Sequence, residues 1–130
     1  MKKAFLSTIF FMCLLILVAC NNGNSQVVFK GKGENWNGEL VASHNLWGEE
    51  IHTLKINYIG ENPKQLKETN VFVECSDFLG WGINEIELDA HGNFNSGEVA
   101  KVDSKTPTTS TIFLEIDGEN PETITLTSNS

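Results

Sequence analysis

Apolar and polar residues alternate with a period of two in several separate stretches of this 130-residue chain. The pattern is clearest at 36–43 and 51–59, and it returns at 112–117 and 123–126. Successive side chains of a strand point to opposite faces, so this alternation is typical of strands with one face in a core. No stretch has helical periodicity, and parallel sheets need crossover helices. The chain is therefore expected to form an antiparallel all-β fold.

The alternating stretches and the turn residues between them predict about eight short strands in one domain, residues 27–130. The expected strands are 27–29, 36–43, 51–59, 71–75, 83–88, 94–102 with a bulge at Gly97, 112–117 and 123–126. This number and spacing favour an antiparallel β-sandwich of immunoglobulin-like architecture, with a small barrel as the alternative. The stretch Phe78-Leu79-Gly80-Trp81-Gly82 is expected to be a loop, because it combines large aromatics with glycines.

The N-terminus has the pattern of an export signal. Lys2 and Lys3 precede an apolar run over 4–19, which is the charged and apolar order of a signal peptide. A membrane-spanning helix needs about 20 apolar residues. The run here is shorter and is followed by the polar stretch 21–25. We therefore expect the segment to direct export and then to be removed.

The end of this segment, Leu17-Val18-Ala19-Cys20, resembles the lipobox of bacterial lipoproteins at all four positions. The resemblance implies that the Cys20 thiol receives a diacylglyceryl group and that a signal peptidase cuts before Cys20. Residues 1–19 would then be a lipoprotein signal peptide, and 20–26 the lipidated cysteine and a flexible tether. The protein would be held at the outer face of the cell membrane. An ordinary signal peptide with an incidental cysteine is the alternative.

Two further stretches resemble small lipoproteins of Bacillus and its relatives. Residues 31–36, Gly-Lys-Gly-Glu-Asn-Trp, resemble a motif near the start of those proteins and depart from it at Lys32 and Gly33. Residues 112–117 and 124–126 resemble the strand, glycine turn and strand at their far end. The match covers both edges of the domain and little of its middle. It implies the location and the fold, and it transfers no catalytic residue.

The charge of the chain restricts its partners. After removal of residues 1–19, seven lysines and no arginine remain against 17 acidic residues, a formal charge of −10. Nucleic acid is not an expected partner, because binding phosphates requires a basic face. The expected partners are the membrane, through the Cys20 anchor, and an envelope protein or peptide.

No pattern of catalytic or metal-binding residues is present in the sequence. His44, His52 and His91 lack a second histidine or cysteine at metal-site spacing. The turn beginning at Asp89 has only a faint similarity to a calcium loop and is expected to be a polar β-turn. After export Cys75 would have no disulfide partner apart from lipidated Cys20, and we expect it to be buried and inert. We therefore predict no catalytic residue, no metal and no cofactor.

The candidate binding residues are Trp47, Phe78 and Trp81, all in or beside predicted loops. Aromatic side chains in loops can form a contact surface, and they can also fold inward to plug the end of a sandwich. Both arrangements remain open from the sequence. The leading hypothesis is a lipid-anchored, non-enzymatic binding or interaction module outside the cytoplasm. The alternatives are an inhibitor of an envelope protease or cell-wall hydrolase, and a hydrolase with an unrecognised site.

Overall fold

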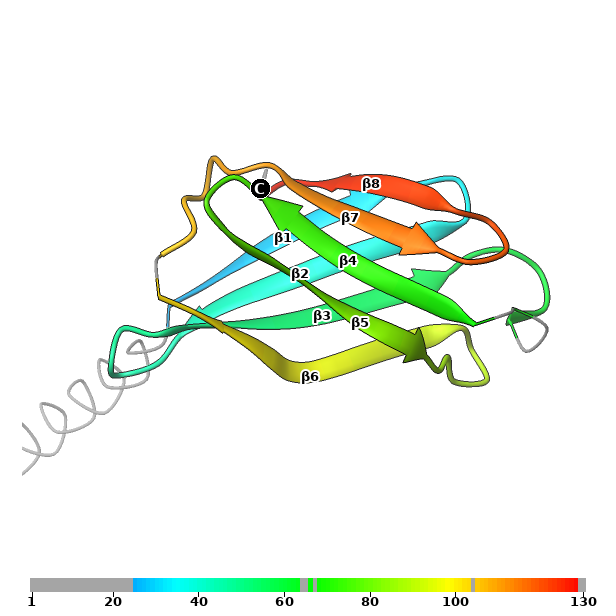
Figure 1. The fold of residues 1–130 in the computed structure, drawn as a ribbon, viewed down its shortest axis with the longest axis horizontal. Coiled ribbons are helices and arrows are strands. Elements are labelled where there is room, and N and C mark those ends of the chain that lie inside the picture. The colour runs from blue at the N-terminus through cyan, green and yellow to red at the C-terminus, as the bar shows by residue number, and fades with distance from the viewer. Residues whose placement is uncertain (1–24, 64–65, 67, 104, 129–130) are drawn as a thin grey trace, which may run out of the picture.

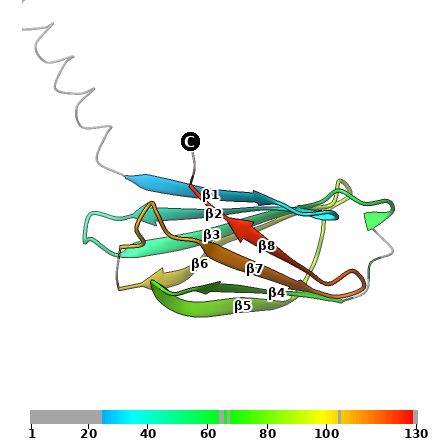
Figure 2. The same ribbon diagram turned by 90° about the horizontal axis from the view of Figure 1, so that it is seen from above.

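The computed structural model describes residues 25–63, 66, 68–103 and 105–128, which form two packed antiparallel sheets (Figure 1). Sheet A has the strand order β1-β2-β3-β6, and sheet B has the order β5-β4-β7-β8. The strands are β1 (Gln26–Lys32), β2 (Trp36–His44), β3 (Glu50–Tyr58), β4 (Thr69–Cys75), β5 (Phe78–Ile86), β6 (Asn93–Val102), β7 (Ile112–Asp117) and β8 (Glu122–Leu126). The predicted antiparallel β-sandwich is confirmed, and Figure 2 shows its two layers from above.

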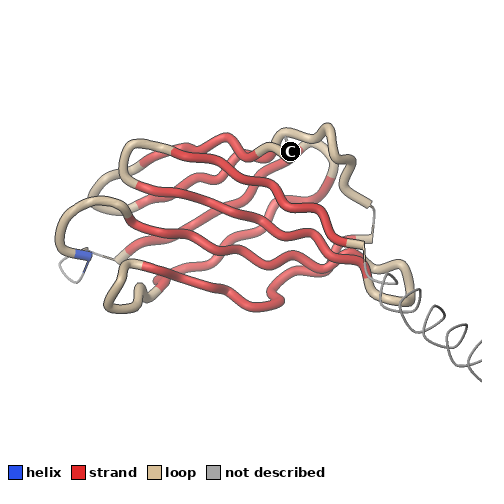
Figure 3. Tube along the Cα trace, turned by 180° about the vertical axis from the view of Figure 1, so that it is seen from behind, coloured by secondary structure: helices blue, strands red, loops and turns tan. Residues whose placement is uncertain are grey.

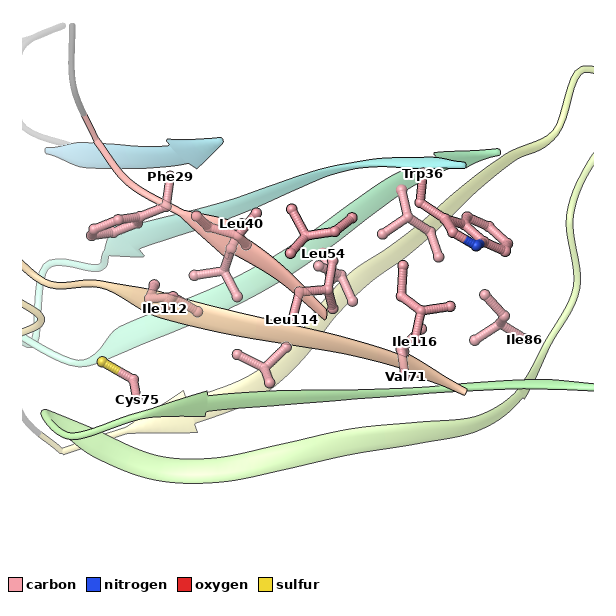
Figure 4. Close-up of a cluster of buried hydrophobic side chains, with 14 of the residues drawn as sticks. Phe29, Trp36, Leu40, Leu54, Val71, Cys75, Ile86, Ile112, Leu114 and Ile116 are labelled. Carbon is pink, nitrogen blue, oxygen red and sulfur yellow. The ribbon is translucent and has the colours of Figure 1, made fainter. Parts of the chain in front are cut away.

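The core lies between the sheets and is built by the alternating residues. Phe29, Leu40, Leu54 and Leu114 have no exposed surface. Figure 4 shows these side chains pointing into the space between the layers. Trp36 closes one end of the core, where its ring lies 4.8 Å from the ring of Tyr58 across the β2–β3 pair. The period-two pattern therefore identified the buried faces of β2, β3 and β7 correctly.

The β2–β3 hairpin is the longest regular pairing in sheet A, with a register that runs from Trp36 opposite Tyr58 to His44 opposite Glu50. Its turn is held by Asn45, whose Oδ1 accepts the amide hydrogens of Trp47 and Glu49 at 3.0 Å each. Short polar side chains of this kind stabilise turns by such local bonds. Strands β2 and β3 thus form a hairpin whose turn is fixed by hydrogen bonds.

The two sheets join along one side, where β1 meets the end of β8. Lys30 N donates to Thr127 O at 2.8 Å, and Thr127 N donates to Lys30 O at 3.0 Å. Gly31 lies at this junction, and a side chain there would collide with the backbone carbonyl of Thr125. The close approach therefore requires glycine at this position.

Strand β6 carries the expected bulge. Gly97 has φ of 66°, and the register between β3 and β6 shifts on both sides of Thr53. A positive φ suits glycine, and an extra residue in one strand produces this kind of shift. The predicted irregularity at Gly97 is therefore confirmed.

Most strands have at least one boundary that differs from the expected one, and the largest difference is in β5. Residues 78–82 belong to β5 instead of a loop, and β5 ends at Ile86 instead of residue 88. Strand β1 starts at Gln26, one residue inside the expected tether. Cys20 and the predicted signal peptide lie outside the described residues. Strands and the turns between them make up nearly all of the described chain (Figure 3). No helix in the described residues is long and apolar enough to cross a membrane.

Candidate functional site

The three aromatic residues singled out in the sequence do not share one surface. Trp47 lies at the β2–β3 turn with 86% of its surface exposed. Phe78 is buried, and its ring lies 4.6 Å from the ring of His52. Trp81 is half-buried against the core, and its Nε1 donates to His52 Nδ1 at 3.0 Å. Phe78 and Trp81 thus take the inward arrangement, and Trp47 points away from the domain.

His52 belongs to a buried polar cluster with Glu50, two residues before it on β3. Both side chains have no exposed surface, and Glu50 Oε2 lies 2.9 Å from His52 Nε2. Glu50 also accepts hydrogen bonds from the backbone amide of Thr106, at 2.8 Å, and from the Thr106 hydroxyl. His44 approaches from β2, with Nε2 3.0 Å from Glu50 Oε1. The carboxylate therefore has polar neighbours on both of its oxygens.

The hydrogen bonds define the protonation state of this cluster. An indole N–H only donates, so His52 Nδ1 must accept from Trp81 and the ring proton must sit on Nε2. That proton is donated to Glu50. Burial lowers the pKa of His52 and outweighs the hydrogen bond and charge of Glu50, which raise it. The imidazole is therefore neutral.

Burial acts to raise the pKa of Glu50, but the hydrogen bonds from Thr106 and His52 outweigh it and hold the pKa below its usual value. The carboxyl group is therefore ionised. Neither ring nitrogen of His52 remains free to exchange a proton with a substrate. The cluster consequently has a structural role, despite containing the residue types of a catalytic pair.

The described part of the chain holds no group of three or more His, Cys, Asp or Glu residues placed to bind a metal. Asp89 Oδ1 accepts the amides of His91 and Asn93 at 2.9 Å each, which makes a polar β-turn. The hydrogen bond from the Asn93 amide, with that from His91, lowers the pKa of Asp89. Cys75 is a free, buried thiol, as expected.

The outer face of sheet A carries two rows of polar side chains that cross all four strands. We call this surface the lysine–asparagine face. One row is Lys30, Glu39, Lys55 and Asn95, and the next is Lys32, Asn37, Asn57 and Asn93. Residues opposite each other in a sheet lie close enough to act on one ligand.

The lysine–asparagine face is hollowed. It lines a groove of about 700 Å³, and Phe94 and the turn residue Asp89 also belong to the lining. Asn57 Nδ2 donates to Asn93 Oδ1 at 2.5 Å, whereas Asn37 Oδ1 is buried and has no hydrogen-bond partner. Within the described residues, no acidic side chain forms an ion pair with Lys30, Lys32 or Lys55, so the lysines of the groove are not neutralised by contact.

Sequence reasoning missed both features. Glu50 lies two residues before His52 in the sequence. Extending the alternation of His52 and Leu54 by two residues toward the N-terminus would have assigned Glu50 to the inner face. The lysine–asparagine face has no local signal, because each of its residues occupies an ordinary outward position. Only the register of four strands brings them together.

The fold and this surface define an antiparallel β-sandwich protein with a polar, lysine-bearing groove on one sheet. No family model, no curated protein and no solved structure gives a significant match to the chain.

Proposed function

We propose that this protein is a lipid-anchored, extracytoplasmic binding module that holds an anionic, hydroxyl-rich ligand on the lysine–asparagine face. The observation that carries the proposal is the groove itself. It gathers three lysines against Glu39 and Asp89, in a chain whose formal charge is −8. Positive charge concentrated on one face of an acidic protein favours a ligand with negative groups.

The chemistry of the face suits a ligand that is extended as well as charged. The two rows cross the four strands of sheet A, whose neighbours lie about 4.8 Å apart. The lysines supply charged donors, and the four asparagines supply donors and acceptors for hydroxyl groups.

The buried state of the Glu50–His52 pair favours binding over hydrolysis. A general base must lie within hydrogen-bond reach of the proton that it takes. His52 has no exposed surface, and both of its nitrogens have partners inside the protein. The proposed activity therefore requires no catalytic residue, metal or cofactor.

The lipobox supports the location. A diacylglyceryl cysteine supplies two acyl chains, and two chains anchor a protein stably where one does so only marginally. We expect mass spectrometry of the membrane-extracted protein to find diacylglyceryl on an N-terminal Cys20, and Cys20→Ser to leave uncleaved, unlipidated precursor. A Cys20→Ser protein that is cut at the same bond and stays on the membrane would contradict the anchor.

The binding surface is tested by calorimetric titration of the protein with dextran sulfate and with uncharged dextran. We expect binding of dextran sulfate only, and at least about a tenfold loss of affinity in the Lys30→Gln/Lys55→Gln double variant, which is 1.4 kcal/mol. Lys101→Gln/Lys105→Gln removes the same charge outside the groove and should change the affinity less than about twofold. Equal losses in the two double variants would show a general charge effect and would refute the site.

A further inference from the structure

The β2–β3 turn presents two large apolar side chains to solvent. Leu46 is 88% exposed and Trp47 is 86% exposed, at adjacent positions. The turn is held by Asn45, which accepts from the amides of Trp47 and Glu49 through its side chain and from the Gly48 amide through its carbonyl at 3.1 Å. We call residues 45–49 the hairpin tip. Its apolar side chains are thus presented on an ordered turn.

The hairpin tip lies beside the point where the N-terminal segment enters the domain. Strand β1 begins with Gln26 opposite Ser43, next to the end of β2. The His44 amide donates to Ser25 O at 3.1 Å, one residue before the tip. Figure 1 shows the start of β1 and the β2–β3 turn at the same end of the sandwich. The chain therefore leaves the domain next to Leu46 and Trp47.

The length of chain before Ser25 limits how far this end lies from an anchor at Cys20. Five residues extend at most about 18 Å. A strand of nine residues such as β3 is itself about 30 Å long. An anchored Cys20 therefore holds the hairpin tip near the bilayer, while the opposite end of β3 can lie much farther away.

We propose that the hairpin tip is a second membrane contact, in which Leu46 and Trp47 enter the interface of the bilayer beside the lipid anchor. This inference rests on the anchor of the proposed function. Tryptophan suits the interface because its ring is apolar and its N–H finds polar partners there. Burial of apolar side chains, and not charge attraction, would drive this contact, because the domain is acidic and the tip itself carries Glu49. Two attachment points orient the domain, which a single flexible tether does not.

The test uses the mature, lipidated protein in phosphatidylcholine vesicles, with and without bromine-labelled acyl chains. Bromine quenches only tryptophan that reaches the acyl region. We expect quenching of the wild-type emission and loss of that quenching in Trp47→Phe, because Trp36 is buried in the core and Trp81 is half-buried against it. Ile59→Ala changes an exposed apolar residue just beyond the opposite end of β3 and should leave the quenching unchanged.

The possible results separate the contact from the anchor. Mass spectrometry of the vesicle-bound protein reports the diacylglyceryl group independently of fluorescence. Lipidated protein with no quenching, or with equal quenching in Trp47→Phe, would overturn the membrane contact and leave the anchor intact. Protein without lipid on Cys20 would overturn the anchor and this inference together. Trp47 shielded from aqueous iodide but not quenched by bromine would show a protein occupant of the tip, and would overturn the inference.

Discussion

Glu50→Ala is expected to lower the free energy of unfolding by about 3–5 kcal/mol, because it removes the ionised acceptor of a buried hydrogen-bond network. Glu50 has no exposed surface and accepts from the Thr106 amide, the Thr106 hydroxyl and His52 Nε2. Its removal leaves these buried donors without an acceptor, and each such group costs about 1–3 kcal/mol. Urea denaturation followed by tryptophan fluorescence measures the change.

The neighbouring residue supplies the control for this prediction. Glu49 is exposed, so Glu49→Ala should stay within about 0.5 kcal/mol of the wild-type protein. A similar loss in both variants would show that Glu50 is not buried as described.

The same measurement across pH tests the protonation states of the cluster. The pKa of His52 is lowered by burial, so below its ordinary value of 6.5 the unfolded chain binds a proton that the native imidazole does not. The pKa of Glu50 is also lowered, by hydrogen bonds that outweigh burial, so its stabilisation is present above 4.5 and lost as pH falls through the native pKa. Both groups make the wild-type protein less stable on acidification. A denaturation midpoint that rises between pH 7 and pH 5 would contradict this.

Leu114→Ala is expected to cost about 2–5 kcal/mol, because it leaves a cavity that the two sheets cannot close. Leu114 lies within β7, paired with Val73 on one side and Ile124 on the other, and it has no exposed surface. Its side chain also occupies the space that a side chain at Gly38 would fill in the facing sheet. Urea denaturation measures the loss.

Thr125 provides the matched comparison, since it lies on β8 and points to solvent. Thr125→Ala should cost well under 1 kcal/mol. Equal losses at Leu114 and Thr125 would contradict the register of β7 and β8.

The alternation of apolar and polar residues could predict the buried face of a strand, because every second side chain of the strand enters the core. It placed Trp36, Leu40, Leu54 and Leu114 correctly. It failed at 78–82, where glycines suggested a loop. In the structure a side chain at Gly80 or Gly82 would lie 3.0 Å from the Phe72 ring of the neighbouring strand. These glycines therefore make room for Phe72 in a sheet, a tertiary reason that local composition does not contain.

The candidate site was harder to predict than the fold. The lysine–asparagine face depends on the register of β1, β2, β3 and β6, and β6 reaches that register only through its bulge. A shift of one residue in any strand would turn its members of the rows inward. The buried polar cluster could not be predicted either, because the hydrogen bond from Trp81 to His52 joins residues 29 positions apart. No local pattern indicates such a pairing.

The position of β1 has a mechanical consequence. Lys30 and Lys32, on the proposed binding face, and the exit toward the tether all belong to this one strand. A force between a ligand held there and a membrane-bound Cys20 would pull along β1, parallel to the strand. Because the ligand would also be held by Lys55 on β3, the part of the force that enters through β3 would reach β1 across the seven β1–β2 residue pairs, which would be loaded together in shear. Sheet B would lie beside this path, so the domain could carry tension without its core being drawn open.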